Sequence, residues 1–584
     1  MDRRGLITLG GLRSGRGENA PNSPRRRSVG VALVCLTLLL LASCSPAEEE
    51  TGAEEGPTTS ATEGGGEAAG GPSGELVVAT GHSGNHTWSP SQSGGETLAM
   101  AKHMHDSLVQ VNPETQQLEG MLAESYSVSD DGLTWNFKLR PNIQFHDDWG
   151  TLTAEDVKYT WGEWMREDSN QNTNAQLREA IGGDLDNIEI VSDLEFNIHL
   201  VEPSFDLDTL LVHSYNNLFV TSKKYHEEDP NADDHPIGTG PWKFVSSTPG
   251  VEVVMEANTD YWGTVPSFER LVIKEIPDGS ARLVQVQSGE VDISTLDSAL
   301  VGEAEAAGLE IIPAEDIGTL QVILGGMYYL PAGDPNLPKD QLDRDSPWIQ
   351  ADEPEKGLAI RQAMSLAINR EQILQTVLGG YGEINYAPLI QYNANPELVD
   401  PSWELPEFDL EQAKQKLAEG GYPNGFPVEV FLYQDEVDTM RVGEAIAGMW
   451  EELGLQVTRR PSEEDILDPL LNARDTAGFV FVKLQGNEPM NIVLHQYASA
   501  REDGDYKINH PIIDEGVDAY IAAPTQEEKY AIQRETATRM RDEMIIIPMF
   551  NVDLPMVVGP GVADWSPVPG DKELNNLNTA TAAG

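Results

Sequence analysis

The chain has 584 residues, with 38 Lys and Arg against 96 Asp and Glu, and its formal net charge is −58. This acidic balance argues against a nucleic-acid-binding protein, because phosphate contacts require clustered Lys and Arg. The length predicts two or three lobes, and the 39% of hydrophobic residues is sufficient for their cores. Both cysteines, Cys35 and Cys44, lie near the start, so no disulfide framework and no cysteine zinc site is expected in the rest of the chain.

Residues 1–43 are predicted to be a signal peptide. They contain seven Arg, no Lys, one Asp and one Glu, so their net charge of +5 is opposite in sign to that of the whole chain. Arg25–Arg27 precede the apolar run Val29–Leu41, whose 13 residues fit the core of a signal peptide. A membrane-spanning helix needs about 20 residues. The run ends in Leu41-Ala42-Ser43-Cys44, which resembles the lipobox of bacterial lipoproteins; this implies lipidation of Cys44, whereas an ordinary signal peptide is the alternative.

Residues 44–75 are predicted to be the lipidated cysteine followed by a disordered tether. The segment Ser45–Glu75 is acidic, rich in Gly, Glu, Thr, Ala and Ser, and has no aromatic residue. Such a composition cannot bury enough apolar surface to offset the entropy that the chain loses on folding. The tether would hold the folded part just outside a membrane.

The first elements of the folded part are expected to be strands. Leu76–Thr80 is a short apolar run with β-type residues. Thr134–Leu139 alternates polar and apolar residues after an Asp-Asp-Gly turn signal, as a half-buried strand does. Thr153, with Asp156 three residues later, then predicts the N-terminus of a helix.

Two later segments have the residue spacing of helices. Ala359–Leu378 places apolar residues near helical spacing, and Glu411–Glu419 is a second helix, which Gly420 and Gly421 would end. Strands and helices alternate along the chain with many Pro and Gly turns between them. The sequence therefore predicts an α/β protein.

A series of segments then follows the pattern of one protein family, in the family's order. These segments are Leu122–Tyr126, Val128–Trp135, Phe137–Pro141, Phe145–Asp147, Leu152–Val157, Gly238–Phe244, Asp260–Trp262, Ile276–Asp278, Gln287–Asp292, Arg361–Ala363, Ala367–Arg370, Gly421–Phe426 and Ile546–Pro548. Together they resemble the extracellular solute-binding proteins, family 5, which are the dipeptide, oligopeptide and nickel receptors of ABC importers. The resemblance extends over about residues 76–560.

The resemblance implies a two-lobed, periplasmic-binding-protein-like α/β fold, in which a hinge closes the lobes on a ligand. By analogy, lobe I consists of residues 76–105, 236–318 and 548–584, an extra subdomain of residues 106–235 is inserted in it, and lobe II consists of residues 319–547. Most of the matched residues are expected to be structural. The aromatic residues Trp135, Phe137 and Trp242 should lie in the core, and the glycines 132, 238 and 240 should allow turns or close backbone approach.

The resemblance also implies the function. It predicts a monomeric, extracytoplasmic receptor, lipid-anchored at the outer face of the bacterial cytoplasmic membrane, that delivers a small solute to the permease subunits of an ABC importer. It implies no catalysis, no cofactor and no nucleic acid. A peptide is the first expectation for the solute, and an oligosaccharide or another non-peptide solute is the alternative. A secreted hydrolase is the remote alternative, since the sequence has no Gly-x-Ser-x-Gly, His-Glu-x-x-His or phosphate-loop motif.

One expected ligand contact departs from the peptide-binding members of the family. In those members an Asp that binds the peptide amine precedes a segment like Asn487-Glu488-Pro489, and Asn487 is itself a candidate contact. Gln485 occupies the Asp position here. A neutral amide cannot neutralise an ammonium group, so Gln485 favours a ligand without a free amine. Should the alignment be shifted by a few residues, Asp503 and Asp505 are the candidate anchors.

The loop after the first strand is the second candidate region, because in the family this loop borders the ligand. Asn85 and Trp88 are the expected contacts, and Trp88 would stack on a sugar ring or a side chain, unless it only braces the hinge. His103 and His105 suggest metal ligation at first sight. Residues two apart on a helix do not face each other, however, so no metal site is predicted.

Overall fold

The computed structural model describes residues 71–583 with several gaps. The residues left out within this range are 82–83, 85, 94, 114, 116, 170, 172–173, 213–217, 327–345, 391–397, 434–436, 463–469, 471–477, 486–496, 498–507 and 509. The predicted signal peptide and Cys44 lie outside the described residues. In the described part, no helix combines the length and the apolar character that a membrane crossing requires.

The largest element is a mixed sheet that has 11 strands among the described residues. Its order is β15-β14-β16-β12-β17-β11-β1-β10-β9-β8, and β13 pairs with β17 off this path. The bounds of these strands are β1 Glu75–Thr80, β8 Trp242–Thr248, β9 Glu252–Ala257, β10 Arg270–Glu275, β11 Ile293–Thr295, β12 Glu310–Leu324, β13 Gly382–Ile384, β14 Pro427–Tyr433, β15 Gln456–Ser462, β16 Phe479–Gln485 and β17 Ile546–Val558. Sequence-distant segments therefore share one sheet.

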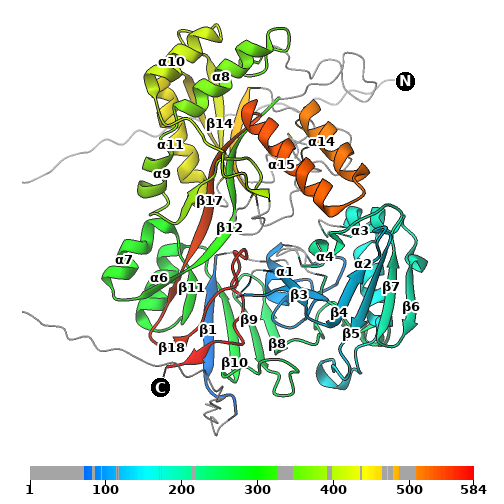
Figure 1. Ribbon diagram of the computed structural model, residues 1–584. Coiled ribbons are helices and arrows are strands. Elements are labelled where there is room, and N and C mark those ends of the chain that lie inside the picture. Colours follow the sequence, from blue (N-terminus) through cyan, green and yellow to red (C-terminus); the bar gives the residue numbers. More distant parts are fainter. Residues whose placement is uncertain are drawn as a thin grey trace, which may run out of the picture. The chain divides into compact units, whose positions relative to one another are not determined.

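Two long antiparallel strands, β12 and β17, join the two ends of this sheet (Figure 1). The register of their ladder shifts at two places, between Ala314 and Gly318 and between Leu320 and Gln321. Before the first shift, β12 residues Glu310–Ala314 pair with the end of β17 that also pairs with β11, whereas after it Thr319–Leu324 pair with β16. The shift between Ala314 and Gly318 therefore separates the part of the sheet that contains β1, β9 and β10 from the part that contains β14 and β16.

Three smaller sheets accompany the large one in the described residues. One has four strands in the order β4-β5-β7-β6, and the other two are hairpins of β2 with β3 and of β18 with β19. The bounds are β2 Val109–Val111, β3 Leu118–Gly120, β4 Ala123–Val128, β5 Thr134–Leu139, β6 Ile188–Ser192, β7 Glu195–His199, β18 Val562–Asp564 and β19 Thr581–Ala582. None of these strands pairs with the 11-stranded sheet, so the four-stranded sheet is a separate layer.

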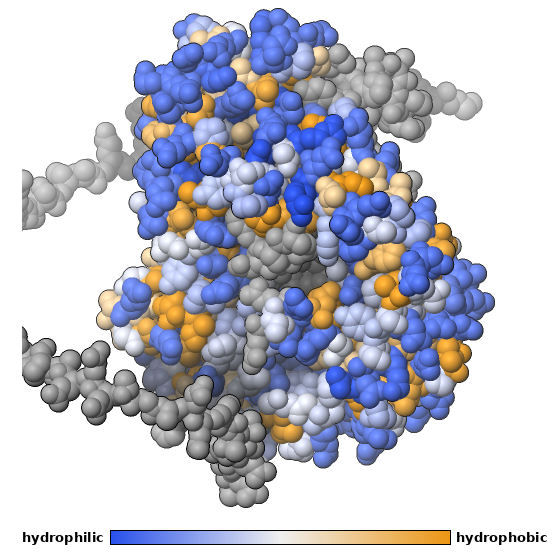
Figure 2. All heavy atoms as spheres, in the orientation of Figure 1, coloured by the Kyte–Doolittle hydropathy of each residue, from blue (hydrophilic) through white to orange (hydrophobic). Residues whose placement is uncertain are grey.

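Helices cover both ends of the large sheet. Figure 1 shows α8, α10 and α11 around the end that holds β14, and α6 and α7 near β11. The bounds are α1 Gly95–Ala101, α2 Ala154–Trp164, α3 Asn174–Ala180, α4 Leu207–Leu210, α5 Lys223–Glu228, α6 Gly279–Ser288, α7 Val301–Ala306, α8 Pro354–Leu366, α9 Arg370–Thr376, α10 Leu410–Glu419, α11 Val437–Leu453, α14 Pro511–Ala522 and α15 Gln526–Asp542, with short 3-10 turns η1 His146–Asp148, η2 Leu185–Asn187 and η3 Ser298–Leu300. On the face shown in Figure 2 hydrophilic residues predominate and hydrophobic ones are scattered among them, as the acidic composition leads one to expect.

Most of the predicted local elements are confirmed. β1 and β5 form where strands were expected. At the start of α2 the backbone N–H and the hydroxyl of Thr153 both donate to Asp156 Oδ2, at 2.9 and 2.8 Å. The predicted helix at Glu411–Glu419 is α10, which ends at Gly420. These elements could be predicted because the signals for them come from residues that are close in sequence.

The single helix predicted over Ala359–Leu378 is wrong. The structure has two helices there, α8 and α9, which are separated by Ala367–Asn369. Asn369 Oδ1 accepts a hydrogen bond from the backbone N–H of Gln372, at 3.0 Å, and so caps α9. The apolar spacing continued through the break, but an Asn side chain that caps a new helix competes with continuation of the old one.

The residues expected to be structural are confirmed in that role. Trp135, Phe137 and Trp242 are at most 2% exposed. A Cβ atom on Gly238 would lie 2.1 Å from the carbonyl oxygen of Met104, so only glycine allows this close backbone approach. The matched glycine segment therefore packs against the chain that follows α1.

His510 caps the N-terminus of α14. Its Nδ1 accepts a hydrogen bond from the backbone N–H of Ile512, at 3.2 Å, and Pro511 begins the helix. Burial lowers the pKa of His510 to about 3, so the ring is neutral and keeps a lone pair for this bond. A neutral imidazole thus acts as the cap of this helix.

Candidate functional site

A row of neutral polar side chains crosses three neighbouring strands of the large sheet. Thr319 of β12 lies opposite Gln485 of β16 on one side and opposite Asn551 of β17 on the other. Directly opposed residues of antiparallel strands point to the same face, so these three side chains share one face of the sheet. Each is at most 6% exposed. Gln485, which the sequence predicts as a ligand contact, therefore lies among other buried hydrogen-bonding groups.

A second row lies two residues further along the same strands. Gln321 of β12 is opposite Lys483 of β16. The Nε2 group of Gln321 donates to the hydroxyl of Tyr497, at 2.9 Å. Lys483 Nζ lies 5.0 Å from the ring centroid of Tyr433, which places the cation over an aromatic face.

The rows contain buried polar atoms whose partners do not lie in the described part of the chain. Thr319 Oγ1 and Gln321 Oε1 have no hydrogen-bond partner among the described residues. Buried polar atoms normally have one. Both side chains are at most 2% exposed and lie on the face that carries Gln485. We therefore regard them as candidate contacts for a bound solute.

The far end of the first row differs in charge from the Gln485 end. Asn551 lies opposite Glu383 of β13, whose side chain is exposed and accepts a hydrogen bond from Asn551 Nδ2 at 3.5 Å. Asn385 Nδ2 donates to Asn551 Oδ1 at 2.6 Å and orients this amide. The carboxylate of Glu383 is thus separated from Gln485 by β12 and β17. Near Gln485 the described side chains of Thr319, Gln321 and Lys483 provide hydroxyl, amide and ammonium groups.

Close backbone approach positions Gln485. A Cβ atom on Gly318 would lie 2.3 Å from the carbonyl oxygen of Gln485, so a larger residue would push β16 away from β12. Gly318 directly follows the irregular stretch of the β12–β17 ladder. The candidate site thus lies directly after this irregular stretch.

The loop after β1 is anchored by polar and aromatic contacts. Trp88 is 6% exposed, packs edge-to-face on Phe244 with ring centroids 5.7 Å apart, and its backbone N–H donates to the carbonyl of Asp233 at 3.0 Å. The ring of His86 contacts the Glu275 carboxylate through Nε2 and Ser247 Oγ through Nδ1, the latter at 2.9 Å. The indole of Trp88 therefore lies in the core near β8.

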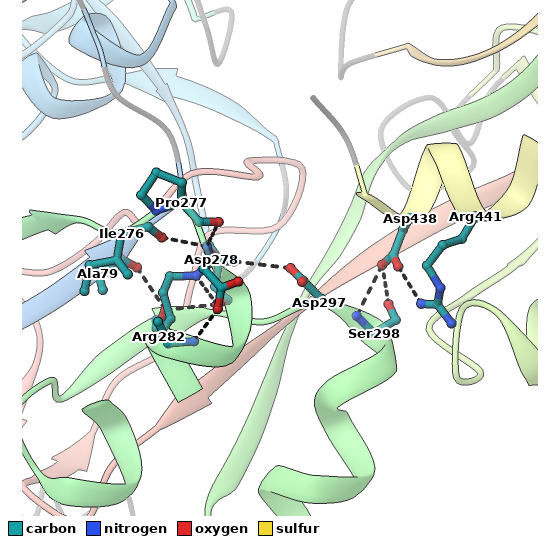
Figure 3. Close-up of polar contacts among 12 residues, drawn as sticks. Ala79, Ile276, Pro277, Asp278, Arg282, Asp297, Ser298, Asp438 and Arg441 are labelled. Carbon is teal, nitrogen blue, oxygen red and sulfur yellow. Dashed lines mark hydrogen bonds and ion pairs between the residues drawn. The ribbon is translucent and has the colours of Figure 1, made fainter. Parts of the chain in front are cut away.

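A charged cluster lies close to the start of this loop (Figure 3). Arg282 of α6 is 5% exposed and donates to the carbonyl oxygens of Ile276, Pro277 and Thr295 at 2.9, 3.0 and 3.2 Å, and to Asp297 Oδ1 at 3.2 Å. One guanidinium thus fixes the segment before α6 and the segment after β11. Burial raises the pKa of Asp297, and the positive charge of Arg282 opposes that rise.

The next residue connects this cluster to the other end of the large sheet. The backbone N–H and the hydroxyl of Ser298 both donate to Asp438 Oδ2, at 3.3 and 2.6 Å, and Arg441 donates to Asp438 Oδ1 at 3.0 Å. Figure 3 shows Ser298 and Asp438 facing each other. Asp438 lies in the first turn of α11, which packs on β14 and β16, whereas Ser298 follows β11. The Ser298–Asp438 contact is therefore a polar bridge between the two ends.

The predicted ligand contacts divide between described and undescribed residues. Gln485 and Trp88 are described, and they lie in different groups of strands: Gln485 ends β16, and Trp88 packs on β8. The other predicted site residues lie outside the described residues: Cys44, Asn85, Asn487, Asp503 and Asp505. The roles of all seven in ligand binding or lipidation stay predictions.

The histidines weighed as metal ligands are buried and neutral. His103 and His105 lie in the turn after α1, and burial lowers the pKa of each to about 3. His105 Nδ1 is 3.1 Å from the carbonyl oxygen of Ala101, and its ring stacks on Phe219. In the described part of the chain no three His, Cys, Asp or Glu side chains are grouped so as to hold a metal ion.

Sequence reasoning did not single out Thr319, Gln321 or Asn551. A signal for the first two exists, because they are polar residues two apart within the apolar run Ile317–Leu324, which is the period of a strand with one polar face. Asn551 has no such local signal. Its place beside Thr319 follows only from the register of β12 and β17.

Comparison with known proteins identifies the family. Residues 117–508 match the family described as bacterial extracellular solute-binding proteins, family 5 Middle. The chain belongs to this family. Among curated relatives of this solute-binding protein, heme-binding protein A of Haemophilus influenzae is 22% identical, over 77% of this chain and 82% of its own. The nickel-binding periplasmic protein of Escherichia coli is 23% identical, over 83% and 90%.

Solved structures share the fold of this solute-binding protein. The ABC transporter substrate-binding protein CtaP of Listeria monocytogenes has a TM-score of 0.70 at 19% identity, with 88% of this chain and 99% of its own covered. The oligopeptide-binding protein AppA of Bacillus subtilis, in complex with a nonapeptide, has a TM-score of 0.68 at 18% identity, with 88% and 100% covered. The expected α/β, two-lobed periplasmic-binding-protein-like fold is thereby confirmed. Members of the family are binding proteins rather than enzymes.

Proposed function

We propose that this chain is the lipid-anchored receptor of an ABC importer, which binds a small solute between two lobes and delivers it to permease subunits in the membrane. The observation that carries this proposal is the family match over residues 117–508. The buried polar rows on β12, β16 and β17 support it, because their hydroxyl and amide groups could hydrogen-bond a solute. The receptor would act as a monomer.

The proposed lobes follow the bounds expected from the sequence. Lobe I would consist of residues 76–105, 236–318 and 548–584, with the subdomain 106–235, and lobe II of residues 319–547. The irregular pairing between Ala314 and Gly318 supports a hinge at this point, since a ladder without regular hydrogen bonds bends more easily. Because a solute that closes the lobes must bind the closed state more tightly, the solute-bound protein should have a smaller radius of gyration in X-ray scattering.

For the solute, a peptide is the first candidate. The relatives named for dipeptides and oligopeptides support it, and AppA holds a nonapeptide. A neutral, hydroxyl-rich solute such as an oligosaccharide is the second candidate. The described side chains beside Gln485 favour it, because Thr319, Gln321 and Lys483 include no carboxylate that could pair with a peptide amine.

The substitution Gln485→Asp separates the two candidates. It should strengthen the binding of free-amine peptides, because a carboxylate forms a charge-assisted hydrogen bond with the amine. It should weaken the binding of a neutral sugar, because it buries an unpaired charge. Calorimetric titration of both proteins with a short peptide mixture and an oligosaccharide panel measures this, with Gln456→Asp on the exposed edge of β15 as the control. Equal peptide binding by wild type and Gln485→Asp would show that Gln485 does not contact the amine.

The membrane anchor is tested separately. Cys44→Ala should move the protein from the membrane fraction to the soluble fraction, because it removes the sulfur that would carry the lipid. Cys35→Ala is the matched control, since Cys35 lies within the apolar run of the predicted signal peptide and should leave the fractionation unchanged. A Cys44→Ala protein that stays with membranes would contradict lipidation as the anchor.

A further inference from the structure

A polar contact joins the segment after β7 to the helices α14 and α15. The hydroxyl of Tyr520 in α14 donates to Asp206 Oδ2, although the two residues are 314 positions apart. Lys529 Nζ of α15 lies 4.4 Å from the ring centroid of Tyr520 and 6.0 Å from that of Phe205. Tyr520 is 5% and Lys529 2% exposed. The contact thus contains a buried hydroxyl and a buried cation.

The charges of this contact complement each other across the two segments. Burial lowers the pKa of Lys529, and the negative charge of Asp206 opposes that effect. Burial and Asp206 together raise the pKa of Tyr520 well above its usual range, so the phenol stays protonated and donates. A buried cation is costly without a nearby negative charge. Asp206 supplies that charge from a distant part of the chain.

Each partner is fixed to its own part of the fold. On one side, Ser204 Oγ donates to Asp206 Oδ1 at 2.7 Å, and the carbonyl of Ser204 accepts a hydrogen bond from Trp135 Nε1 of β5 at 3.0 Å. Asp206 is therefore oriented by the four-stranded sheet. On the other side, α15 packs against both α14 and β17. No strand pairing connects these two parts among the described residues, since the four-stranded sheet is separate from the 11-stranded one.

We propose that Asp206, Tyr520 and Lys529 form a latch, a side-chain contact that holds the inserted subdomain against lobe II and so favours the closed arrangement before any solute binds. The proposal rests on the two lobes proposed above, because Asp206 lies in residues 106–235, and Tyr520 and Lys529 lie in residues 319–547. Opening the lobes would expose Lys529 and Tyr520 to water and separate Asp206 from both. The latch therefore adds to the population of the closed state.

Burial distinguishes this contact from the ion pairs on the surface. The side chains of the Lys138–Glu124 pair are 56% and 44% exposed, and such pairs contribute little because water screens them. In the contact proposed here Tyr520 and Lys529 are buried and Asp206 is half-buried, and a hydrogen bond to a charged carboxylate is worth more than one between neutral groups. Its loss should change the ratio of open to closed protein by at least about tenfold.

Hydrogen exchange of the full chain without added solute tests the latch. Tyr520→Phe should accelerate amide exchange about tenfold or more in residues 204–209 and in the first two turns of α15 at the same time, because opening exposes both sides. Tyr225→Phe is the matched control: its hydroxyl donates to the carbonyl of His235 at 2.6 Å within the subdomain. This control should accelerate exchange only near residues 225–235.

A second variant tests the same contact from the other side. Asp206→Asn should accelerate exchange in α15, and the double variant with Tyr520→Phe should exceed the larger single effect only slightly, since both remove one contact. Acceleration confined to the substituted side in both single variants would overturn the latch, and so would fully additive effects. Neither measurement uses a solute or a permease, so a failure of the transport function would leave these results unchanged.

Discussion

Replacing Arg282 by Met should destabilise the fold far more than replacing an equally well-bonded arginine on the surface. The guanidinium donates to three backbone carbonyls and to Asp297, and the residue is 5% exposed. Methionine keeps most of the apolar stem and removes every donor. The carbonyls of Ile276, Pro277 and Thr295 then lose a charged donor in a region where water replaces it poorly.

The magnitude follows from burial and from the number of bonds. Removing one partner of a buried ion pair costs about 3–5 kcal/mol, because the remaining group stays buried without compensation. Asp297 is 24% exposed in its side chain, so water partly solvates the carboxylate that remains. We therefore expect a loss of about 3–4 kcal/mol in the free energy of unfolding, within the range for such pairs.

Arg459→Met is the matched control. Arg459 makes hydrogen bonds of 2.7, 2.7 and 3.1 Å to Glu444 and Glu451, but its side chain is 32% exposed. Exposed pairs of this kind contribute up to about 1 kcal/mol. Urea unfolding followed by tryptophan fluorescence, with a common m-value, compares the two variants with the wild type. If the two substitutions lower stability by equal amounts, burial does not determine the contribution of Arg282.

Two further effects are expected on stability. Gly238→Ala should lower the free energy of unfolding by more than about 2 kcal/mol, because its Cβ would lie 2.1 Å from the carbonyl oxygen of Met104. Gly302→Ala in α7, where a Cβ has nothing within 4 Å, should raise that free energy by about 0.5–1 kcal/mol. Thermal melting should therefore show a lower melting temperature for the first variant and a higher one for the second. Burial, followed by the charge of Asp206, raises the pKa of Asp208 to about 6, so the folded protein binds this proton more tightly than the unfolded chain does. The stabilisation that protonated Asp208 contributes therefore decreases by up to about 3 kcal/mol as the pH rises from about 4 to 6. In Asp208→Asn this part of the pH dependence should be absent from the urea midpoints measured between these pH values. An unchanged pH profile in the variant would contradict the raised pKa.

The parts of the fold that could be predicted depend on neighbours in sequence. The alternation in Thr134–Leu139, the cap at Thr153 and the glycines after Glu419 each act within a few residues, and the structure has each element where it was expected. The break between α8 and α9 was missed because apolar spacing and the cap of Asn369 give opposite signals. There the side chain of one polar residue outweighs the pattern of its neighbours.

The parts that could not be predicted from the residues alone depend on contacts between distant segments. The sequence identified Gln485 through its family position, but its place beside Thr319 and Asn551 requires the register of β16, β12 and β17. The contact between Asp206 and Tyr520 could not be predicted from the neighbouring residues, since each is an ordinary polar residue in its own segment. The fold, rather than the local sequence, brings the residues of both contacts together.

The position of β17 in the sheet has a consequence for the order in which the protein is made. This strand, residues Ile546–Val558, lies between β12 and β11, and through it alone the β14–β16–β12 strands join the β11–β1–β10 strands among the described residues. A ribosome synthesises it after all the other strands of that sheet. The nascent chain therefore cannot complete its largest sheet until synthesis is almost finished, and pairings of such large sequence separation form slowly. Delayed completion of the sheet would keep the chain unfolded for longer, which would suit the export that the predicted signal peptide implies.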